Sequence, residues 1–310
     1  MNDPVLPVEI GLTAAIVAMA GDVPMILTAS AGEGQAALPS GPFNPLQHRT
    51  FEIGLRAWVA RQTGAHLGYV EQLYTFGDRG RHARQGDRDP HGVSVGYLAL
   101  ARIGDDAEEN AGFRPWYGFF PWEDWRMGRP ALIEALILPE LTNWADRDRV
   151  RRERATRLFG ASARHDEENV LERYELLYEA GLVEEARRDG RETALARLSL
   201  PVLGQPMRFD HRRILATAIG RLRAKMKYRP VIFELMPEVF TLTHLQRTVE
   251  AISGRHFHKQ NFRRLVDASN VAEPTGAESV ATGGRPAALF RFRRELRERA
   301  GVGLRVGGRG

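Results

Sequence analysis

The stretch that most constrains the fold lies near the C-terminus, at residues 240–293. Leucine, valine and isoleucine recur at helical spacing after Thr241, a residue type that often caps a helix, and Gly254 stands where this helix would end. A second helix is predicted from about His258 to Ala268. Two short helices joined by a tight turn are typical of a helix-turn-helix, whose second helix enters the major groove of DNA.

The predicted second helix buries an apolar face and exposes residue types that suit DNA. An arginine can donate two hydrogen bonds to guanine or hold a phosphate, and an asparagine suits adenine. Two strand-like segments follow, VAEPTG and ALFRF, around a glycine-rich loop whose Arg285 has the reach to enter a minor groove or contact the DNA backbone. The predicted DNA contacts of this winged helix are Lys259, Asn261, Arg263, Arg264 and Arg285, with solvent-facing side chains as the alternative.

Charge is distributed unevenly along the chain. From residue 207 to the end there are 21 lysine and arginine residues against 9 acidic ones, whereas residues 1–206 hold 23 basic and 30 acidic residues. A strongly periodic helix at 208–227, with Arg213, Arg221, Arg223 and Lys225 away from its apolar side, adds to the basic part. The asymmetry indicates that the C-terminal part meets a polyanion, although arginine-rich surfaces throughout the chain would give a similar count.

The N-terminal part has the pattern of a sheet with a helix. Two apolar runs, Leu12–Ala20 and Val23–Thr28, flank a Gly-Asp turn and predict a hairpin. A helix is predicted over Thr50–Arg61, with Gly64 as its C-cap. Further strands are expected at YVEQLYTF and at residues 92–102. This order of strands around one helix is typical of an α+β domain.

The middle of the chain differs in composition from both ends. Residues 113–128 are rich in aromatic side chains, which form a core edge or an interface more often than a base-stacking platform. Amphipathic helices follow, and their arginine-rich run at 147–157 is a candidate anion-binding patch or, alternatively, a solvated helix face with ion pairs one turn apart. The predicted divisions are a sheet domain at 1–128, a helical insertion at 129–206, a winged helix at 207–296 and a disordered tail at 297–310.

The N-terminal segments LPSG, YVEQLYTFGDRGR and DPHGVSVGYLAL resemble a Nudix domain. The signature of that family, G-x5-E-x7-R-E-U-x-E-E-x-G-U with U a bulky aliphatic residue, sets glutamates around Mg²⁺ ions and drives hydrolysis of nucleoside diphosphate derivatives. Aligned on Gly64, the R-E-U-x-E-E positions hold residues 57–62, AWVARQ, and the upstream glutamate position holds Arg49; alignment from Gly41 recovers no glutamate either. Because Mg²⁺ ions need several carboxylate oxygens and Glu52 stands alone, we predict neither a metal site nor Nudix catalysis.

Arginines stand near the positions of the missing glutamates. Arg49, Arg56 and Arg61 lie just before or within the predicted helix. A guanidinium can neutralise a pyrophosphate in place of a metal ion, so these three are the candidate ligand-binding residues.

A second resemblance covers the C-terminal part. The pattern FDH-x2-I-x3-A, LR-x-K, Y-x-P, FEL-x-P, FTL-x2-LQ and NFR, followed by EPTG and GGRPAALFRF, is similar to the winged-helix domain of the Nudix-related transcriptional regulators of NAD metabolism. The resemblance implies a homodimeric repressor of NAD biosynthesis or salvage genes that binds double-stranded operator DNA. It also implies a Nudix-like domain that senses a nucleotide such as ADP-ribose as an effector, without any cofactor.

The expected fold is therefore α+β: an N-terminal Nudix-like mixed sheet with helices, a helical insertion and a C-terminal winged helix-turn-helix. Two other classes stay open. One is a Nudix-type hydrolase with non-standard metal ligands, for which His82, Asp87, Asp89 and His91 are candidates; the other is an adaptor that binds a protein partner. The absence of cysteine, of a basic signal-peptide region and of a membrane-length apolar run favours a cytoplasmic location.

Overall fold

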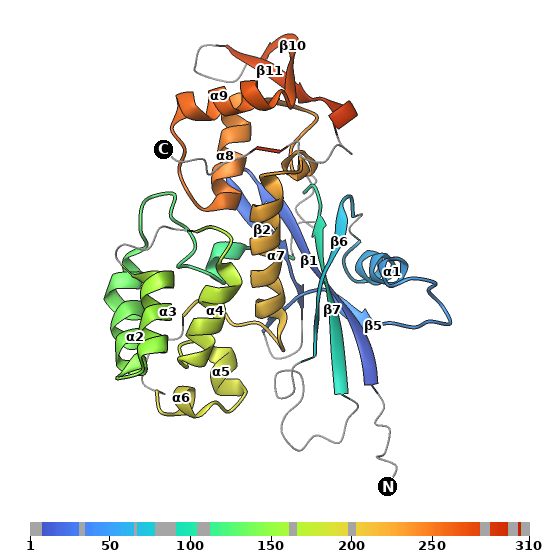
Figure 1. The fold of residues 1–310 in the computed structure, drawn as a ribbon. Coiled ribbons are helices and arrows are strands. Elements are labelled where there is room, and N and C mark those ends of the chain that lie inside the picture. The colour runs from blue at the N-terminus through green and yellow to red at the C-terminus, as the bar shows by residue number, and fades with distance from the viewer. Residues whose placement is uncertain are drawn as a thin grey trace.

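The protein is described by a computed structural model that covers residues 8–30, 35–64, 67–77, 91–103, 112–160, 166–197, 203–279, 286–296 and 303–304. A central sheet carries helices on both faces, and the winged helix lies at one end of the molecule (Figure 1). None of the helices in these ranges is long and apolar enough to span a membrane.

The central sheet is mixed, with strand order β6-β7-β1-β2-β8 and with β5 paired to β1. The predicted hairpin is confirmed, since β1 and β2 pair antiparallel around the turn at Gly21. β1 runs parallel to β7, which gives the sheet its mixed character. The strands are β1 (Val8–Ala20), β2 (Val23–Leu27), β5 (Ser40–Pro42), β6 (Val70–Phe76), β7 (His91–Leu100) and β8 (Phe113–Pro115), and a separate small pair is formed by β3 (Ala29–Ser30) and β4 (Ala36–Ala37).

One face of the sheet is covered by α1 (Phe51–Thr63). Gly64 ends the helix with φ +69°, as predicted, and Thr50, predicted as the first helical residue, is its N-cap: its Oγ1 atom accepts a hydrogen bond from the Ile53 N–H at 3.3 Å. Leu55 and Val59 of α1 are buried against β1 and β7. This apolar layer fixes the helix that corresponds in position to the Nudix signature.

The opposite face is covered by α7 (His211–Met226), which contacts β1, β6 and β7 (Figure 1). The same helix also packs against α4 and α8, so it touches all three predicted parts of the chain. Its arginines do not all lie on the outside: Arg212 and Arg223 are buried, at 0% and 1% exposure. The prediction that Arg223 lies away from the apolar side of this helix is therefore wrong, and Arg212, for which the sequence predicts no position, is buried as well.

The helical insertion packs beside α7 and shares one core with it. It begins with a π-helical turn at Ile133–Ile137 and continues with α2 (Leu138–Ala145), α3 (Arg149–Phe159), α4 (Val170–Glu179), α5 (Glu184–Arg188) and α6 (Glu192–Leu195). The aromatic segment before it contains a 3-10 turn, Trp116–Gly118, and it belongs to the core, as expected. The fully buried aromatic side chains of this segment are Trp116, Phe119, Phe120 and Trp122.

The C-terminal part forms two helices and a sheet of three strands in the order β10-β11-β9. The sequence predicts two strands here; β9 is a third, and it pairs with β11 from Val239 to Thr241. The elements are a 3-10 turn at Val231–Glu234, β9 (Val239–Thr241), α8 (Leu242–Ser253), α9 (Lys259–Ser269), β10 (Ala272–Ser279), β11 (Ala287–Phe292) and a 3-10 turn at Arg294–Leu296.

Two residues of the predicted disordered tail, Gly303 and Leu304, lie in the described part of the chain. Leu304 is buried, and its N–H donates to the Met226 carbonyl at 2.9 Å. This residue is therefore packed against the end of α7, in contrast to the disorder that we expected for residues 297–310.

Candidate nucleic-acid interface

The first helix of the interface, α8, is anchored at both ends by local interactions. The Oγ1 atom of Thr241 accepts a hydrogen bond from the His244 N–H at 3.1 Å, which satisfies one of the free amide groups at the helix start. Gly254 ends the helix with φ +72°, a left-handed conformation that favours glycine. The inner face of α8 carries Leu245, Val249 and Ile252, which are fully buried. The sequence prediction of this helix and both caps is confirmed.

The turn between α8 and α9 is held by Glu250. Its Oε1 atom accepts hydrogen bonds from the Phe257 N–H at 2.8 Å and from the Gln246 side chain at 2.9 Å, and it lies 3.0 Å from Nδ1 of His256. One carboxylate thus ties the turn back to α8 and fixes where α9 begins.

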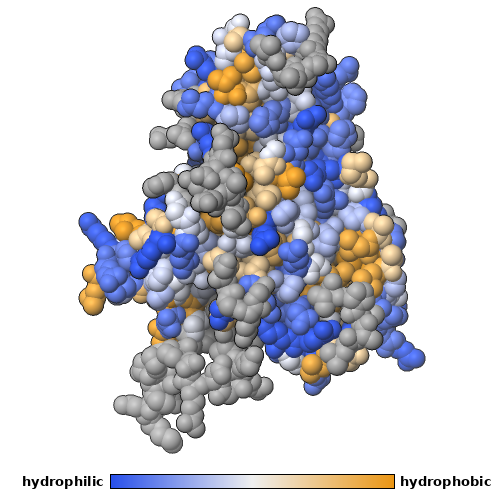
Figure 2. Space-filling model, turned by 180° about the vertical axis from the view of Figure 1, so that it is seen from behind, coloured by the Kyte–Doolittle hydropathy of each residue, from blue (hydrophilic) through white to orange (hydrophobic). Residues whose placement is uncertain are grey.

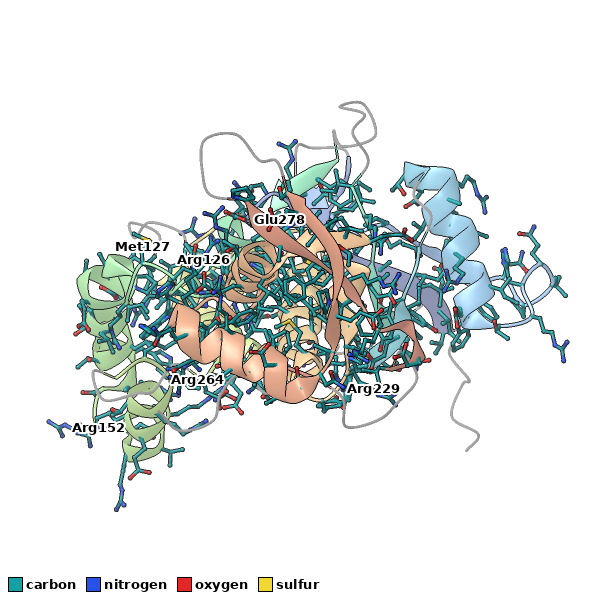
Figure 3. The ribbon with its side chains drawn as sticks, turned by 90° about the horizontal axis from the view of Figure 1, so that it is seen from above. Arg126, Met127, Arg152, Arg229, Arg264 and Glu278 are labelled. Atoms are coloured by element: carbon teal, nitrogen blue, oxygen red, sulfur yellow. The ribbon has the colours of Figure 1, made fainter. Side chains whose placement is uncertain are left out.

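The second helix, α9, lies across this end of the molecule (Figure 3). Phe262 and Val266 bury its inner face, whereas Lys259, Asn261, Arg263 and Arg264 are all exposed, as predicted. In the part of the chain that the structure describes, no carboxylate pairs with Lys259, Arg263 or Arg264. The basic side chains of α9 are therefore available to an anionic partner.

The helical geometry divides these side chains into a centre and two flanks. At about 100° per residue, Arg264 lies opposite the buried face, Lys259 and Arg263 lie along one flank, and Asn261 lies on the other. Gln260, which is not among the predicted DNA contacts, is exposed beside Arg264 at the centre. Its position four residues before Arg264 was the signal that could have identified it.

A shallow hollow of about 370 Å³ lies between α8 and the start of α9. Of its lining residues only Lys259 is among the predicted DNA contacts; the other cationic or titratable groups carry no local sequence signal. The lining residues are Thr243, Gln246, Arg247, Glu250, His256, His258 and Lys259. His258, the residue before α9, makes no side-chain cap hydrogen bond to the start of this helix.

The wing is built on an aromatic stack. The rings of Phe233 and Phe292 lie 4.4 Å apart and nearly parallel, which joins the 3-10 turn before β9 to the end of β11. Between β10 and β11, residues 280–285 lie outside the described part of the chain, and the predicted wing contact Arg285 is among them.

His244, in the first turn of α8, makes the free energy of unfolding depend on pH. Burial lowers the pKa of its imidazole below the usual value of 6.5, Arg247 also lowers it, and Asp22 acts in the opposite direction. Because the folded protein disfavours the charged form, this contribution is fully present above pH 6.5 and is lost as the pH falls through the folded-state pKa. We expect the melting temperature of His244→Gln to fall less than that of the wild type between pH 7.5 and pH 5.5. Equal falls in the two proteins would contradict this assignment.

The three arginines proposed for a ligand site near α1 do not form one cluster. Arg56 donates hydrogen bonds to Glu52 at 2.9 Å and to the Leu67 carbonyl at 2.7 Å, so it ties α1 to the next segment. Arg61 lies over the ring of Trp58 at 4.4 Å, and Arg49 is exposed before the helix. No group of three or more histidine, aspartate or glutamate side chains within the described ranges could hold a metal ion. His82, Asp87, Asp89 and the side chain of His91 lie outside those ranges.

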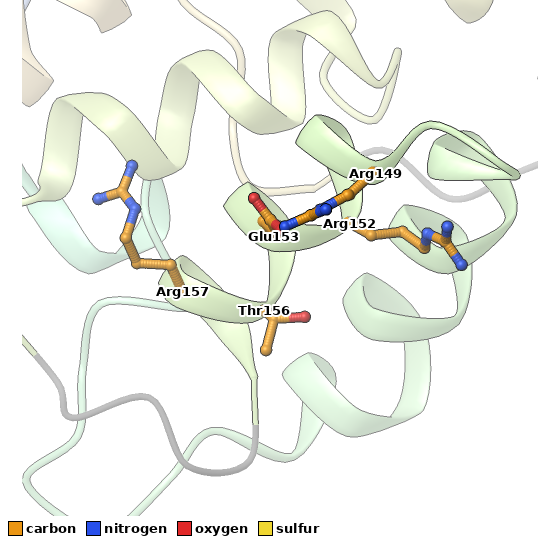
Figure 4. A pocket seen from close by; sticks show the side chains of 5 residues that line it. All are labelled: Arg149, Arg152, Glu153, Thr156 and Arg157. Carbon is orange, nitrogen blue, oxygen red and sulfur yellow. The ribbon is translucent and has the colours of Figure 1, made fainter.

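The arginine-rich face of α3 lines a second hollow, of about 420 Å³ (Figure 4). Arg149 pairs with Glu153 at 2.7 Å, and Arg157 pairs with Glu172 of α4 at 2.7 Å. These ion pairs match the alternative of a solvated helix face, so α3 offers less free positive charge than its sequence suggests.

Fold and site together define a protein with a Nudix-like sheet domain and a winged-helix DNA-binding domain. Residues 232–292 match the family described as NrtR DNA-binding winged helix domain. A curated relative, the ADPR responsive transcriptional repressor NtrR of Acinetobacter baylyi, is 44% identical over 84 residues, which are 27% of this chain and 33% of the relative. The chain thus matches about a third of the length of that relative.

Solved structures resemble the chain over almost its whole length. Shewanella oneidensis NrtR complexed with a 27mer DNA has a TM-score of 0.56 at 18% identity, covering 94% of this chain and 96% of that one. A MutT/nudix family protein from Enterococcus faecalis has a TM-score of 0.50 at 15% identity, covering 94% and 89%. The predicted fold class and the resemblance to the Nudix-related transcriptional regulators are confirmed.

Proposed function

We propose that this protein is a sequence-specific DNA-binding transcriptional regulator, a repressor of NAD biosynthesis or salvage genes. The observation that carries the proposal is the exposed basic α9, with Lys259, Arg263 and Arg264 unpaired by any described carboxylate, inside a segment that matches the NrtR DNA-binding domain. Asn261 and the central pair Gln260 and Arg264 supply the groups that read base edges, and the flank supplies phosphate contacts.

The proposed input is ADP-ribose or a related nucleotide that binds the Nudix-like domain without being hydrolysed. The curated relative is named as ADPR responsive, which supports this effector. The Nudix signature positions hold no glutamate in this chain, so we propose that catalysis is lost. Arg49 and Arg61 lie at opposite ends of α1, so each is proposed as a separate candidate cation for the pyrophosphate, whereas Arg56 serves to hold α1 in place.

We also propose that the protein acts as a homodimer, because operators read by paired winged helices need two copies. Large apolar side chains are exposed at α1 and the loop before it: Leu46 is 95% exposed and Ile53 is 50% exposed. Figure 2, the view from behind, shows apolar patches at the protruding edge of the molecule that α1 forms. Contact between two such edges would cover these side chains.

The proposed regulation is tested with duplexes from the DNA that flanks the gene, in a mobility shift at two salt concentrations with and without ADP-ribose. We expect a specific complex whose affinity falls steeply with salt and changes on addition of ADP-ribose, because phosphate contacts release counterions. A parallel incubation with ADP-ribose and Mg²⁺ or Mn²⁺ is expected to yield no AMP. DNA binding that is insensitive to both sequence and salt would contradict the proposed regulatory function. Formation of AMP would instead support the alternative of a Nudix-type hydrolase.

A further inference from the structure

The C-terminal end of α8 is held by residues from distant parts of the chain. The last turn of a helix leaves carbonyl groups without partners inside the helix. Here the Ala251 carbonyl accepts from the Tyr117 hydroxyl at 2.7 Å, and the Ile252 carbonyl accepts from Nε of Arg223 at 2.8 Å. Burial raises the pKa of the Tyr117 hydroxyl, which keeps it protonated as a donor. The Gly254 carbonyl accepts from the Trp125 N–H at 2.7 Å.

These contacts continue into a buried cluster of charges. The Glu123 carboxylate accepts two hydrogen bonds from Arg173, at 2.5 and 2.7 Å, and one from Arg223 at 2.9 Å. All three residues are at most 3% exposed. A second buried carboxylate, Glu167, lies 3.1 Å from Lys227 and 3.1 Å from Arg255. Among the buried ions alone, the two carboxylates balance the guanidinium groups of Arg173 and Arg223, as buried ions require, while the side chains of Lys227 and Arg255 are 30% and 39% exposed.

The members of this cluster come from every part of the fold. Glu123 follows β8 at the edge of the sheet, Arg173 lies in α4 of the helical insertion, and Arg223 lies in α7. Figure 1 shows α7 running from the sheet to α8, so the cluster sits where the body of the protein meets the winged helix.

We propose that the Glu123–Arg223 pair is the joint that positions α8, and through it α9, on the Nudix-like body, and that the helical insertion serves this joint by supplying Arg173 and Glu167. Arg223 and Glu123 are positioning residues, since neither lies on the exposed face of α9. The inference rests on the proposed function in one respect only, namely that DNA binding is the output of α9.

The chain offers a matched control pair. Arg212 of α7 and Glu185 of α5 form an ion pair of 3.1 Å that is as deeply buried, at 0% and 2% exposure. The other hydrogen-bond partners of Arg212 are the carbonyls of Phe119 and Leu203, and its guanidinium lies over the rings of Phe120, Trp122 and Tyr174; none of these residues belongs to α8. Loss of this pair disturbs the same core but removes no hydrogen bond to α8.

The test compares Glu123→Gln and Arg223→Lys with Glu185→Gln and Arg212→Lys in the full-length protein. Amide hydrogen exchange is measured without DNA, and the dissociation constant for one fixed duplex is measured at a temperature where all variants are folded. For the joint variants we expect exchange at residues 251–262 to rise at least tenfold relative to β1 and β7, and DNA affinity to fall at least tenfold. For the control variants we expect no local change at 251–262 and affinities within about twofold of the wild type.

Equal behaviour of the joint and control pairs would overturn the proposal, because the cluster would then be only a part of the core. If Glu123→Gln does not accumulate as folded protein, Arg223→Lys, which keeps the charge but lacks the planar fork, carries the comparison. Faster exchange at 251–262 in a protein whose wild type binds no DNA would support the joint and reject the proposed function. Unchanged exchange with specific DNA binding by the wild type would reject the joint alone.

Discussion

Replacing Gly254 by alanine is expected to lower the free energy of unfolding by about 2–5 kcal/mol. The left-handed φ of +72° costs a residue with a side chain roughly 1–2 kcal/mol. The new Cβ would also overlap the Glu123 carbonyl oxygen and stand 2.9 Å from Nη2 of Arg223 and 3.0 Å from the Tyr117 hydroxyl. Forcing a methyl group into a packed site costs about 1–3 kcal/mol more. Urea denaturation monitored by circular dichroism measures the sum.

Gly64 provides the control for this substitution. It ends α1 as Gly254 ends α8, with a φ of +69°, but no described atom lies within 4 Å of its Cβ position. Gly64→Ala should therefore cost only the left-handed contribution of roughly 1–2 kcal/mol. Equal losses of unfolding free energy for the two substitutions would show that the atoms around Gly254 can move aside at little cost. A larger loss of unfolding free energy for Gly254→Ala would measure how tightly the end of α8 is packed against Tyr117, Glu123 and Arg223.

Local signals made much of the fold predictable. Thr241 and Gly254 bound α8, and Thr50 and Gly64 bound α1, because caps are chosen by hydrogen bonds within a few residues of the helix end. The exposed face of α9 followed from helical spacing alone. β9 was missed because a strand of three residues has no periodicity of its own and forms only by pairing with β11, about 50 residues later in the chain.

The buried ions were beyond the reach of sequence patterns for a different reason. Arg223 has the spacing of a surface residue on a basic helix, and its partner Glu123 lies 100 residues earlier. Nothing local distinguishes it from an exposed arginine such as Arg264. The same limit affects the charge count, because the balance of the C-terminal part includes Arg212 and Arg223, whose charges are neutralised inside the protein.

Because the charges of these two buried arginines are neutralised, the exposed positive charge of the interface lies mainly on α9. Arg212 and Arg223 of α7 are buried, and Arg149 and Arg157 of α3 are paired to glutamates, so Arg263 and Arg264 stand out as two exposed cations side by side on one helix. Position should then matter more than net charge for DNA binding. The substitutions that remove these two cations separate the two effects.

The double substitution Arg263→Ala/Arg264→Ala is expected to weaken binding to the operator about 100-fold or more. An arginine that contacts a base or a phosphate contributes about 1–3 kcal/mol, and each 1.4 kcal/mol is about tenfold in affinity. Both side chains are exposed, so the free energy of unfolding should change by less than about 0.5 kcal/mol per substitution. Fluorescence anisotropy with a labelled duplex, at several salt concentrations, measures the loss.

The matched control is Arg149→Ala/Arg152→Ala, which removes the same charge from the exposed face of α3. We expect its affinity to stay within a few-fold of the wild type; a loss as large as that of the α9 variant would place DNA on α3 or make net charge the determinant.

The single α9 variants should differ from one another. Arg263→Ala, on the flank, should weaken binding to all sequences alike and lower the salt slope by about one, as loss of a phosphate contact does. Arg264→Ala, at the centre of the face, should instead relax the preference for one base pair, because central side chains reach base edges.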